Sequence, residues 1–260
     1  MSTSESNVAP LADAFLEACE VIALAEQSKI TTRLIGGIAF RAQLPNWTYR
    51  HRPAHDIDFV VQSKEAPGLA RLLEDRGYQP DRRQNALYGH KQLYFVDEKN
   101  QRPVDVIIDR LEMCHTLELK DRLTIDTLTV SRADLLLSKL QIVKLNRKDA
   151  LDVAAMLSMY EVGGEEGIST DALAEVLGRD WGWWRTVSGN LEVIARTLED
   201  DDGTFRADLA MNSSSTCDPA EQLGVLRHFI ETTPKSRTWK LRSRIGERAI
   251  WYEEPEELSH

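Results

Sequence analysis

Arg-Leu-Ile-Gly-Gly-Ile-Ala-Phe (residues 33–40) and His-Asp-Ile-Asp-Phe-Val-Val (55–61) are the segments that decide the fold. In the first, a glycine pair follows a short apolar run, which predicts a strand, a tight turn and the start of a helix. Gly36 and Gly37 there would let backbone N–H groups approach an anion, and the helix N-terminus would add positive partial charge. In the second, residues 56–61 form a predicted strand whose alternation puts Asp56 and Asp58 on one face, about 6–7 Å apart.

Two neighbouring carboxylates repel each other unless a cation lies between them, so Asp56 and Asp58 indicate a divalent metal site. A third carboxylate, Asp105, lies in the apolar run Arg-Pro-Val-Asp-Val-Ile-Ile-Asp (102–109), where burial is costly unless the group is paired or metal-bound. Asp109, further along that run, is the alternative third ligand. Taken alone, a glycine pair is usually only a turn, and an Asp-x-Asp only a solvated loop.

The composition describes a folded protein with a sizeable core. The chain has 260 residues, of which 42% are hydrophobic and 28% charged, and no apolar run is long enough to span a bilayer. The N-terminus lacks the basic and apolar regions of a signal peptide, and three scattered cysteines predict reduced thiols, so we expect a cytoplasmic protein with no membrane association. The net charge of −10 argues against a protein that coats nucleic acid.

Hydrophobic periodicity predicts an α+β fold. Residues 1–130 should form a mixed sheet of about five strands with helices on one face, and residues 131–260 a helical domain. Within the second part, the composition of residues 200–218 predicts a mobile linker. The expected strands cover residues 31–35, 56–61, 87–96, 103–109 and 123–130.

The glycine pair, the Asp-x-Asp strand and Asp105 resemble the DNA polymerase beta-like nucleotidyltransferase superfamily. Leu-Leu-Ser-Lys-Leu (136–140), followed by Arg-Lys-Asp-Ala-Leu-Asp (147–152), is similar to the AbiEii/MenA-type toxin nucleotidyltransferases of type IV toxin–antitoxin systems. The resemblance covers about the first 160 residues. Gly37 departs from the superfamily pattern, in which many members have serine; the change removes a hydroxyl contact to phosphate but keeps the backbone donor.

The resemblance implies a role for each of these residues. Asp56 and Asp58 would hold catalytic Mg²⁺, and Asp105 would bind a second ion and orient the attacking hydroxyl. Lys139, in the helical domain that completes the NTP cleft, would reach the β- and γ-phosphates that Gly36 and Gly37 also contact. Asp149 and Asp152 match an acidic helical motif.

Each of the helical positions also has a simpler interpretation. Lys139 is also typical of an exposed helix edge beside core leucines, and Lys144 is the alternative phosphate ligand. Asp149 and Asp152 are more simply explained as partners of Arg147 or Lys148 than as metal ligands.

We therefore expect an enzyme that transfers a nucleoside monophosphate from an NTP to an acceptor hydroxyl, with two Mg²⁺ ions. The family implies a tRNA 3′ end or a protein as acceptor, a toxin role and a possible antitoxin partner. Two basic clusters favour an RNA acceptor: Arg41, Arg50 and Arg52 near the glycine pair, and a C-terminal cluster within residues 235–248. The alternatives are a small-molecule, antibiotic-type nucleotidyltransferase and an inactive nucleotide- or partner-binding module.

Overall fold

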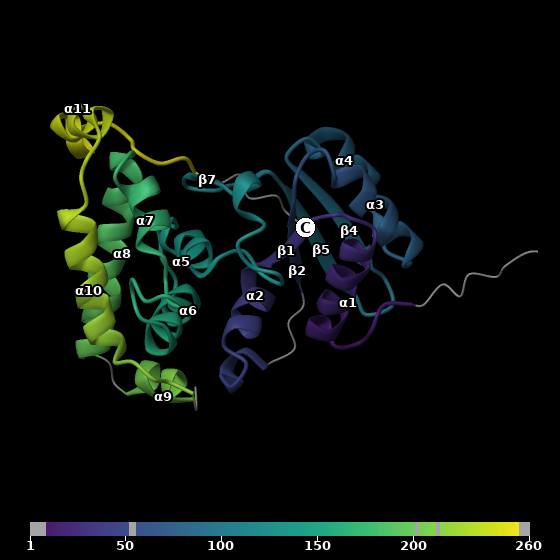
Figure 1. Ribbon diagram of the computed structural model, residues 1–260, viewed down its shortest axis with the longest axis horizontal. Helices are drawn as coiled ribbons and strands as arrows, with labels where there is room; N and C mark the ends of the chain where they lie inside the picture. The colour runs from purple at the N-terminus through teal and green to yellow at the C-terminus, as the bar shows by residue number, and fades with distance from the viewer. Residues whose placement is uncertain (1–8, 52–55, 201–202, 212–213, 255–260) are drawn as a thin grey trace, which may run out of the picture. The chain divides into compact units, whose positions relative to one another are not determined.

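The computed structural model describes residues 9–51, 56–200, 203–211 and 214–254. Within them the chain forms eleven α-helices, a five-stranded sheet and a two-stranded sheet, so it is a mixed α/β protein (Figure 1). The chain divides into two compact units. Unit 1 comprises Met1–Ala42, Arg50–Leu111 and Glu118–Ser131, and unit 2 comprises Gln43–Tyr49, Glu112–Leu117 and Arg132–His260.

Unit 1 is built on the five-stranded mixed sheet, in the order β1-β2-β5-β4-β3. Strands β2 and β5 are parallel, and the other neighbours are antiparallel. The mixed sheet expected from the sequence is thus confirmed. The strand bounds are β1 Thr32–Ile35, β2 Ile57–Val61, β3 Gln79–Pro80, β4 Gln92–Asp97 and β5 Arg102–Ile108.

The helices of unit 1 complete its core. Helix α1 packs against β1 and α3, and α4 packs against β4. The central strands bury their β-branched and aromatic side chains almost completely, Phe59 and Val106 among them, as expected where such residues fill a sheet interior. The bounds are α1 Ala14–Gln27, α2 Gly36–Gln43, α3 Ala66–Asp75 and α4 Arg82–Tyr88, with 3₁₀ turns η1 Thr48–His51 and η2 Lys120–Arg122.

Two expected strands differ from those observed. The first half of the strand predicted at 87–96 is the end of α4 and a turn. The Asn85 side chain bonds to both the N–H and the carbonyl of Tyr94, which joins α4 to the start of β4. The strand predicted at 123–130 is absent: only a single bridge joins Thr129 to Leu34, through two backbone hydrogen bonds on the β1 edge. The fifth strand is instead the two-residue β3.

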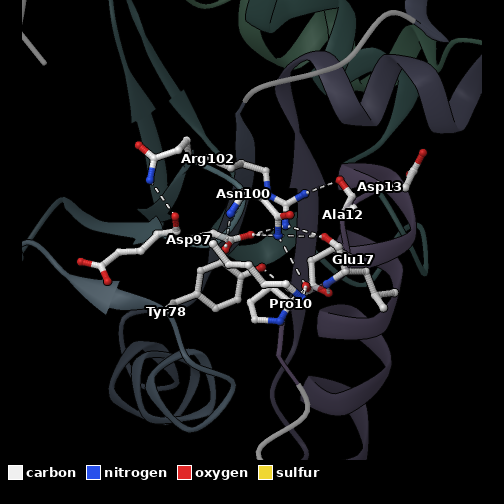
Figure 2. A network of polar contacts seen from close by, with 12 residues as sticks. Pro10, Ala12, Asp13, Glu17, Tyr78, Asp97, Asn100 and Arg102 are labelled. Atoms are coloured by element: carbon white, nitrogen blue, oxygen red, sulfur yellow. Dashed lines mark hydrogen bonds and ion pairs between the residues drawn. The ribbon is translucent and has the colours of Figure 1, made fainter.

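A buried polar network fixes the chain segment that precedes α1 (Figure 2). Glu17 accepts two hydrogen bonds from Arg76, at 2.6 and 2.7 Å, and one from the Tyr78 hydroxyl at 2.8 Å. Beside it Arg102, paired with Asp97 at 2.5 Å, donates to the backbone carbonyls of Leu11 and Ala12. Because the Leu11 N–H also donates to Glu17, at 2.8 Å, the two ion pairs attach residues 11–12 to the end of α3 and to the β4–β5 hairpin.

Unit 2 is almost entirely helical. Helices α7, α8 and α10 contact one another, and α5 packs on α6, α7 and α8 (Figure 1). Asparagine, serine and aspartate side chains cap the starts of α6, α7, α10 and α11, as helix N-termini require. The bounds are α5 Arg132–Leu140, α6 Arg147–Met159, α7 Thr170–Leu177, α8 Trp181–Asp200, α9 Thr204–Ala210, α10 Pro219–Thr232 and α11 Arg237–Ile245, with η3 at Gly246–Arg248. The short strands β6 Arg110–Glu112 and β7 Thr116–Glu118 form the two-stranded sheet.

The stretch predicted as a mobile linker, 200–218, contains α9. Phe205 and Leu209 are 1% and 7% exposed, and the Asp208 carbonyl accepts a hydrogen bond from the Trp47 indole. Two apolar residues four apart are enough to bury one face of a short helix, a signal that the Asp- and Ser-rich flanks of the stretch obscure. Residues 201–202 and 212–213 of this stretch lie outside the described residues. None of the helices in the described ranges is both long enough and apolar enough to cross a membrane.

Candidate active site

Asp58 and Asp105 are register partners on adjacent parallel strands. Asp58 of β2 stands opposite Asp105 of β5, and partners in a parallel ladder present their side chains to the same face of the sheet. Both residues are half-buried, while their strand neighbours Ile57 and Val104 are fully buried on the other face. The structure therefore brings these two carboxylates together on one face.

Asp56 lies at the start of the same strand. It immediately precedes β2 and is exposed. Strand alternation places it on the face of Asp58, two residues closer to the loop. Residues 52–55 of that loop, including Arg52, lie outside the described part of the chain.

The glycine pair lies directly beside these carboxylates. Ile35, the last residue of β1, pairs with Asp58, and α2 begins at the next residue, Gly36. Gly36 has φ +70°, and a Cβ there would lie 2.0 Å from Oδ2 of Asp58. The Asp58 carboxylate thus occupies the space that a side chain at position 36 would need, so this turn requires glycine.

Gly37 has a basic neighbour. A Cβ at Gly37 would meet Nη1 of Arg50 at 3.4 Å, so the guanidinium group lies alongside the first turn of α2. A helix N-terminus with a neighbouring guanidinium is a suitable environment for phosphate oxygens. The sequence places Arg50 in the basic cluster near the glycine pair, and the structure adds its position beside the first turn of α2.

Tyr94 borders the carboxylate pair on the other side. It is the β4 partner of Asp105 and is 6% exposed. The pKa of Tyr94 is raised to about 12; burial is the larger cause and the negative charge of Asp105 is the next. The phenol therefore stays protonated beside Asp105 at neutral pH, a neighbour that the sequence alone did not indicate.

Asp109 has a structural role that separates it from the pair. It follows the end of β5 with φ +62°, and its carboxylate accepts a hydrogen bond from the Ser63 N–H at 2.8 Å. The strand ends at Ile108, so the alternation that would align Asp109 with Asp105 stops one residue earlier. The structure does not favour Asp109 as an alternative to Asp105.

Lys139 of unit 2 is held by the two helical aspartates. Its ammonium group lies 2.6 Å from Asp149 Oδ1 and 3.4 Å from Asp152 Oδ2. The Lys139 side chain is 14% exposed and the aspartate side chains 7% and 0%. Lys139 is therefore not an exposed helix edge, and these aspartates pair with it rather than with Arg147, which contacts Asp208 instead.

This cluster carries more acidic than basic groups. Asn146 caps α6, accepts a hydrogen bond from the Asp149 N–H and donates its own side-chain amide to Asp149 Oδ2 at 2.7 Å. Two carboxylates facing one ammonium group fix its position with charge-assisted hydrogen bonds. Lys144, the alternative phosphate ligand, is exposed.

The donor set of unit 1 fits a hard cation in part. Asp58 and Asp105 supply the carboxylate oxygens that Mg²⁺ prefers, and Mg²⁺ usually completes its shell with water and substrate phosphates. Within the described ranges, no group of three or more His, Cys, Asp or Glu side chains is gathered to hold a metal. A metal here would be held by the Asp58–Asp105 pair, with Asp56 as the third candidate ligand on the same face, and by non-protein oxygens that complete its shell.

No protein-family model matches the chain, and no match is found among curated proteins. The carboxylate pair, the glycine turn and their neighbours together form the candidate site of unit 1.

Proposed function

We propose that the chain is a metal-dependent nucleotidyltransferase that moves a nucleoside monophosphate from an NTP to an acceptor hydroxyl. The observation that carries the proposal is the alignment of Asp58 with Asp105, directly beside a glycine turn that opens α2. An anion-binding turn next to paired carboxylates is the arrangement that a metal–triphosphate substrate requires.

In the proposed reaction the acceptor oxygen attacks the α-phosphorus, the bond between that phosphorus and the bridging oxygen breaks, and pyrophosphate leaves. Bound Mg²⁺ would neutralise charge on the entering and leaving oxygens. Asp105 accepts the hydrogen bond, and then the proton, of the attacking hydroxyl. The first turn of α2 and Arg50 contact the leaving phosphates.

The test uses NTPs labelled at the α-phosphate, incubated with Mg²⁺ and one of three acceptors: total tRNA, the protein itself or an aminoglycoside. We expect covalent label on one acceptor and release of unlabelled pyrophosphate. The same NTPs labelled at the γ-phosphate should leave every acceptor unlabelled, because the γ-phosphate departs.

Asp58→Asn and Asp105→Asn should each reduce labelling by at least about 100-fold, as expected when a transition-state contact worth about 3 kcal/mol is lost. Asp121→Asn is the matched control, since Asp121 is an exposed carboxylate of the same unit. Equal activity of all three variants would contradict the assignment. Nucleotide binding without transfer to any acceptor would favour the binding-module alternative.

A further inference from the structure

Helix α11 of unit 2 is a short helix that contributes no fully buried residue to the core. It begins at Ser236, whose hydroxyl oxygen accepts a hydrogen bond from the Trp239 N–H at 3.1 Å. A nine-residue helix is marginal in water by itself. Contacts with the rest of unit 2 must therefore hold it.

Its aromatic and guanidinium contacts come from its inner side. The Trp239 ring lies 5.3 Å from the Trp184 ring of α8 in an edge-to-face arrangement. The Arg242 guanidinium lies 4.7 Å above the Trp181 ring and donates to the carbonyls of Gly246 and Ala249. Aromatic anchoring of this kind fixes the helix before any partner arrives.

The opposite side, which we call the outer face of α11, combines aliphatic and basic side chains. Leu241 and Ile245, one helical turn apart, are 60% and 49% exposed. Three exposed basic residues share this side of the helix by their spacing, and none of them forms an intramolecular ion pair within the part of the chain that the structure describes: Arg237, Lys240 and Arg244. Exposed aliphatic groups gathered inside a charged rim are typical of an interaction surface.

The other basic residues of this region are already engaged. Lys235 donates to the Ile230 carbonyl and lies 5.5 Å from the centre of the Trp239 ring. Arg242 is bound on the inner side, as described above. The C-terminal basic cluster expected from the sequence therefore separates into an inner, structural part and the outer face.

We propose that the outer face of α11 docks an acidic, amphipathic protein segment, whose aliphatic side chains cover Leu241 and Ile245 and whose carboxylates pair with the surrounding basic residues. Charge complementarity supports this occupant, because the face is basic on a chain of net charge −10. A symmetric contact with α11 of a second copy would instead bring like charges together.

The side chains of the face favour protein over nucleic acid. Single-stranded nucleic acid is bound by aromatic rings that stack on bases as well as by basic residues. The aromatic ring of α11, Trp239, faces inward against Trp184, and the outer face offers aliphatic groups instead.

The experiment measures binding of the full chain to a fluorescent peptide of about 18 residues, with leucines at helical spacing and glutamates elsewhere. We expect saturable binding that weakens at least about tenfold in Leu241→Ser/Ile245→Ser and in Arg237→Glu/Arg244→Glu. Val193→Ser/Arg196→Glu is the matched control, since Val193 and Arg196 are exposed on α8, and it should bind as the unaltered chain does.

Three results would overturn the proposal. One is equal binding by the outer-face variants and the α8 control. Another is equal binding of a peptide of the same composition with its leucines scrambled, because the attraction would then be charge alone. The third is that the unaltered chain binds total tRNA or anionic vesicles but not the peptide, and that Leu241→Ser/Ile245→Ser abolishes this binding. Circular dichroism of each variant checks that it is folded, and the readout does not depend on nucleotidyl transfer.

Discussion

Gly36 shows how one residue joins backbone conformation to the chemistry of the candidate site. Its φ of +70° suits glycine, and its missing Cβ leaves the space that the Asp58 carboxylate occupies. A side chain at position 36 would therefore have two separate effects. Backbone strain would affect stability, and displacement of Asp58 would affect function.

Gly36→Ala should lower activity by at least about tenfold and destabilise unit 1 by about 1–3 kcal/mol, because the new methyl group displaces the Asp58 carboxylate and strains the turn. Gly203→Ala is the matched control: φ there is +95°, and nothing lies within 4 Å of an added Cβ. Nucleotidyl transfer and thermal unfolding measure the two effects. An activity loss of similar size at Gly203 would show that strain alone is responsible.

At the scale of elements, buried ion pairs fix helices to their neighbours at two places. In unit 1, Glu17 of α1 is bound by Arg76 and Tyr78 (Figure 2). In unit 2, Lys139 near the end of α5 is bound by Asp149 and Asp152 at the start of α6. Removing one partner from such a pair leaves an uncompensated buried charge, which is the costly case.

Glu17→Gln should destabilise unit 1 by about 3–5 kcal/mol, because Arg76 would stay buried without its carboxylate. Burial alone would raise the pKa of Glu17, but hydrogen bonds from Arg76, Leu11 and Tyr78 outweigh it and hold that pKa below its ordinary 4.5. The folded state therefore favours the carboxylate, and this stability is present above pH 4.5 and lost as pH falls below it.

Denaturant unfolding followed by circular dichroism measures this effect, because tryptophan fluorescence would report on unit 2, to which all six tryptophans belong. Glu20→Gln on the exposed side of α1 is the control and should change stability little. A similar loss in both variants would contradict the importance of the network.

Lys139→Ala should destabilise unit 2 by about 3–5 kcal/mol, because Asp149 and Asp152 would stay buried without their cation. Lys144→Ala is the control and should change stability little, because Lys144 is exposed. Urea unfolding followed by tryptophan fluorescence measures the difference, since all six tryptophans belong to unit 2. A similar loss in both variants would contradict the role of Lys139 in fixing α5 to α6.

At the scale of the whole molecule, stability depends on groups that folding removes from water. His115 is 8% exposed, its Nε2 lies 2.8 Å from the Thr186 hydroxyl, and the centre of its ring lies 5.0 Å from that of Trp183. The Trp251 indole donates to the same hydroxyl at 3.1 Å. The Thr186 hydroxyl therefore joins the buried imidazole of His115 to the Trp251 indole.

Burial lowers the pKa of His115 to about 4, despite the opposing charge of Asp180. The unfolded state therefore binds the proton first, so the stability of unit 2 should fall as pH decreases from about 6.5 toward 4, by at most on the order of 3 kcal/mol. Urea unfolding followed by tryptophan fluorescence measures it. His115→Gln should be less stable at pH 7 and should lose most of the pH dependence of stability between pH 6.5 and 4. A parallel decline of stability in both proteins would show that other groups cause this pH dependence.

The sequence determined the local parts of the candidate site. Alternation along residues 56–61 places Asp58 on a different face from the buried Ile57 and Phe59, and the glycine pair predicts the turn into α2. Both features follow from interactions between residues that are close in the sequence, and hydrophobic periodicity and residue type reflect such interactions directly. The same reasoning failed at 123–130, where a strand-like composition meets only one edge of β1.

Only the tertiary structure decided which distant groups meet. Strand β2 pairs with β5 although β3 and β4 lie between them in the chain, and this pairing aligns Asp58 with Asp105. The contact of Lys139 with Asp149 depends on how α5 packs on α6. Arg50 reaches Gly37 across a loop. Such pairings depend on the closure of long loops and on packing between elements, which a local pattern does not encode.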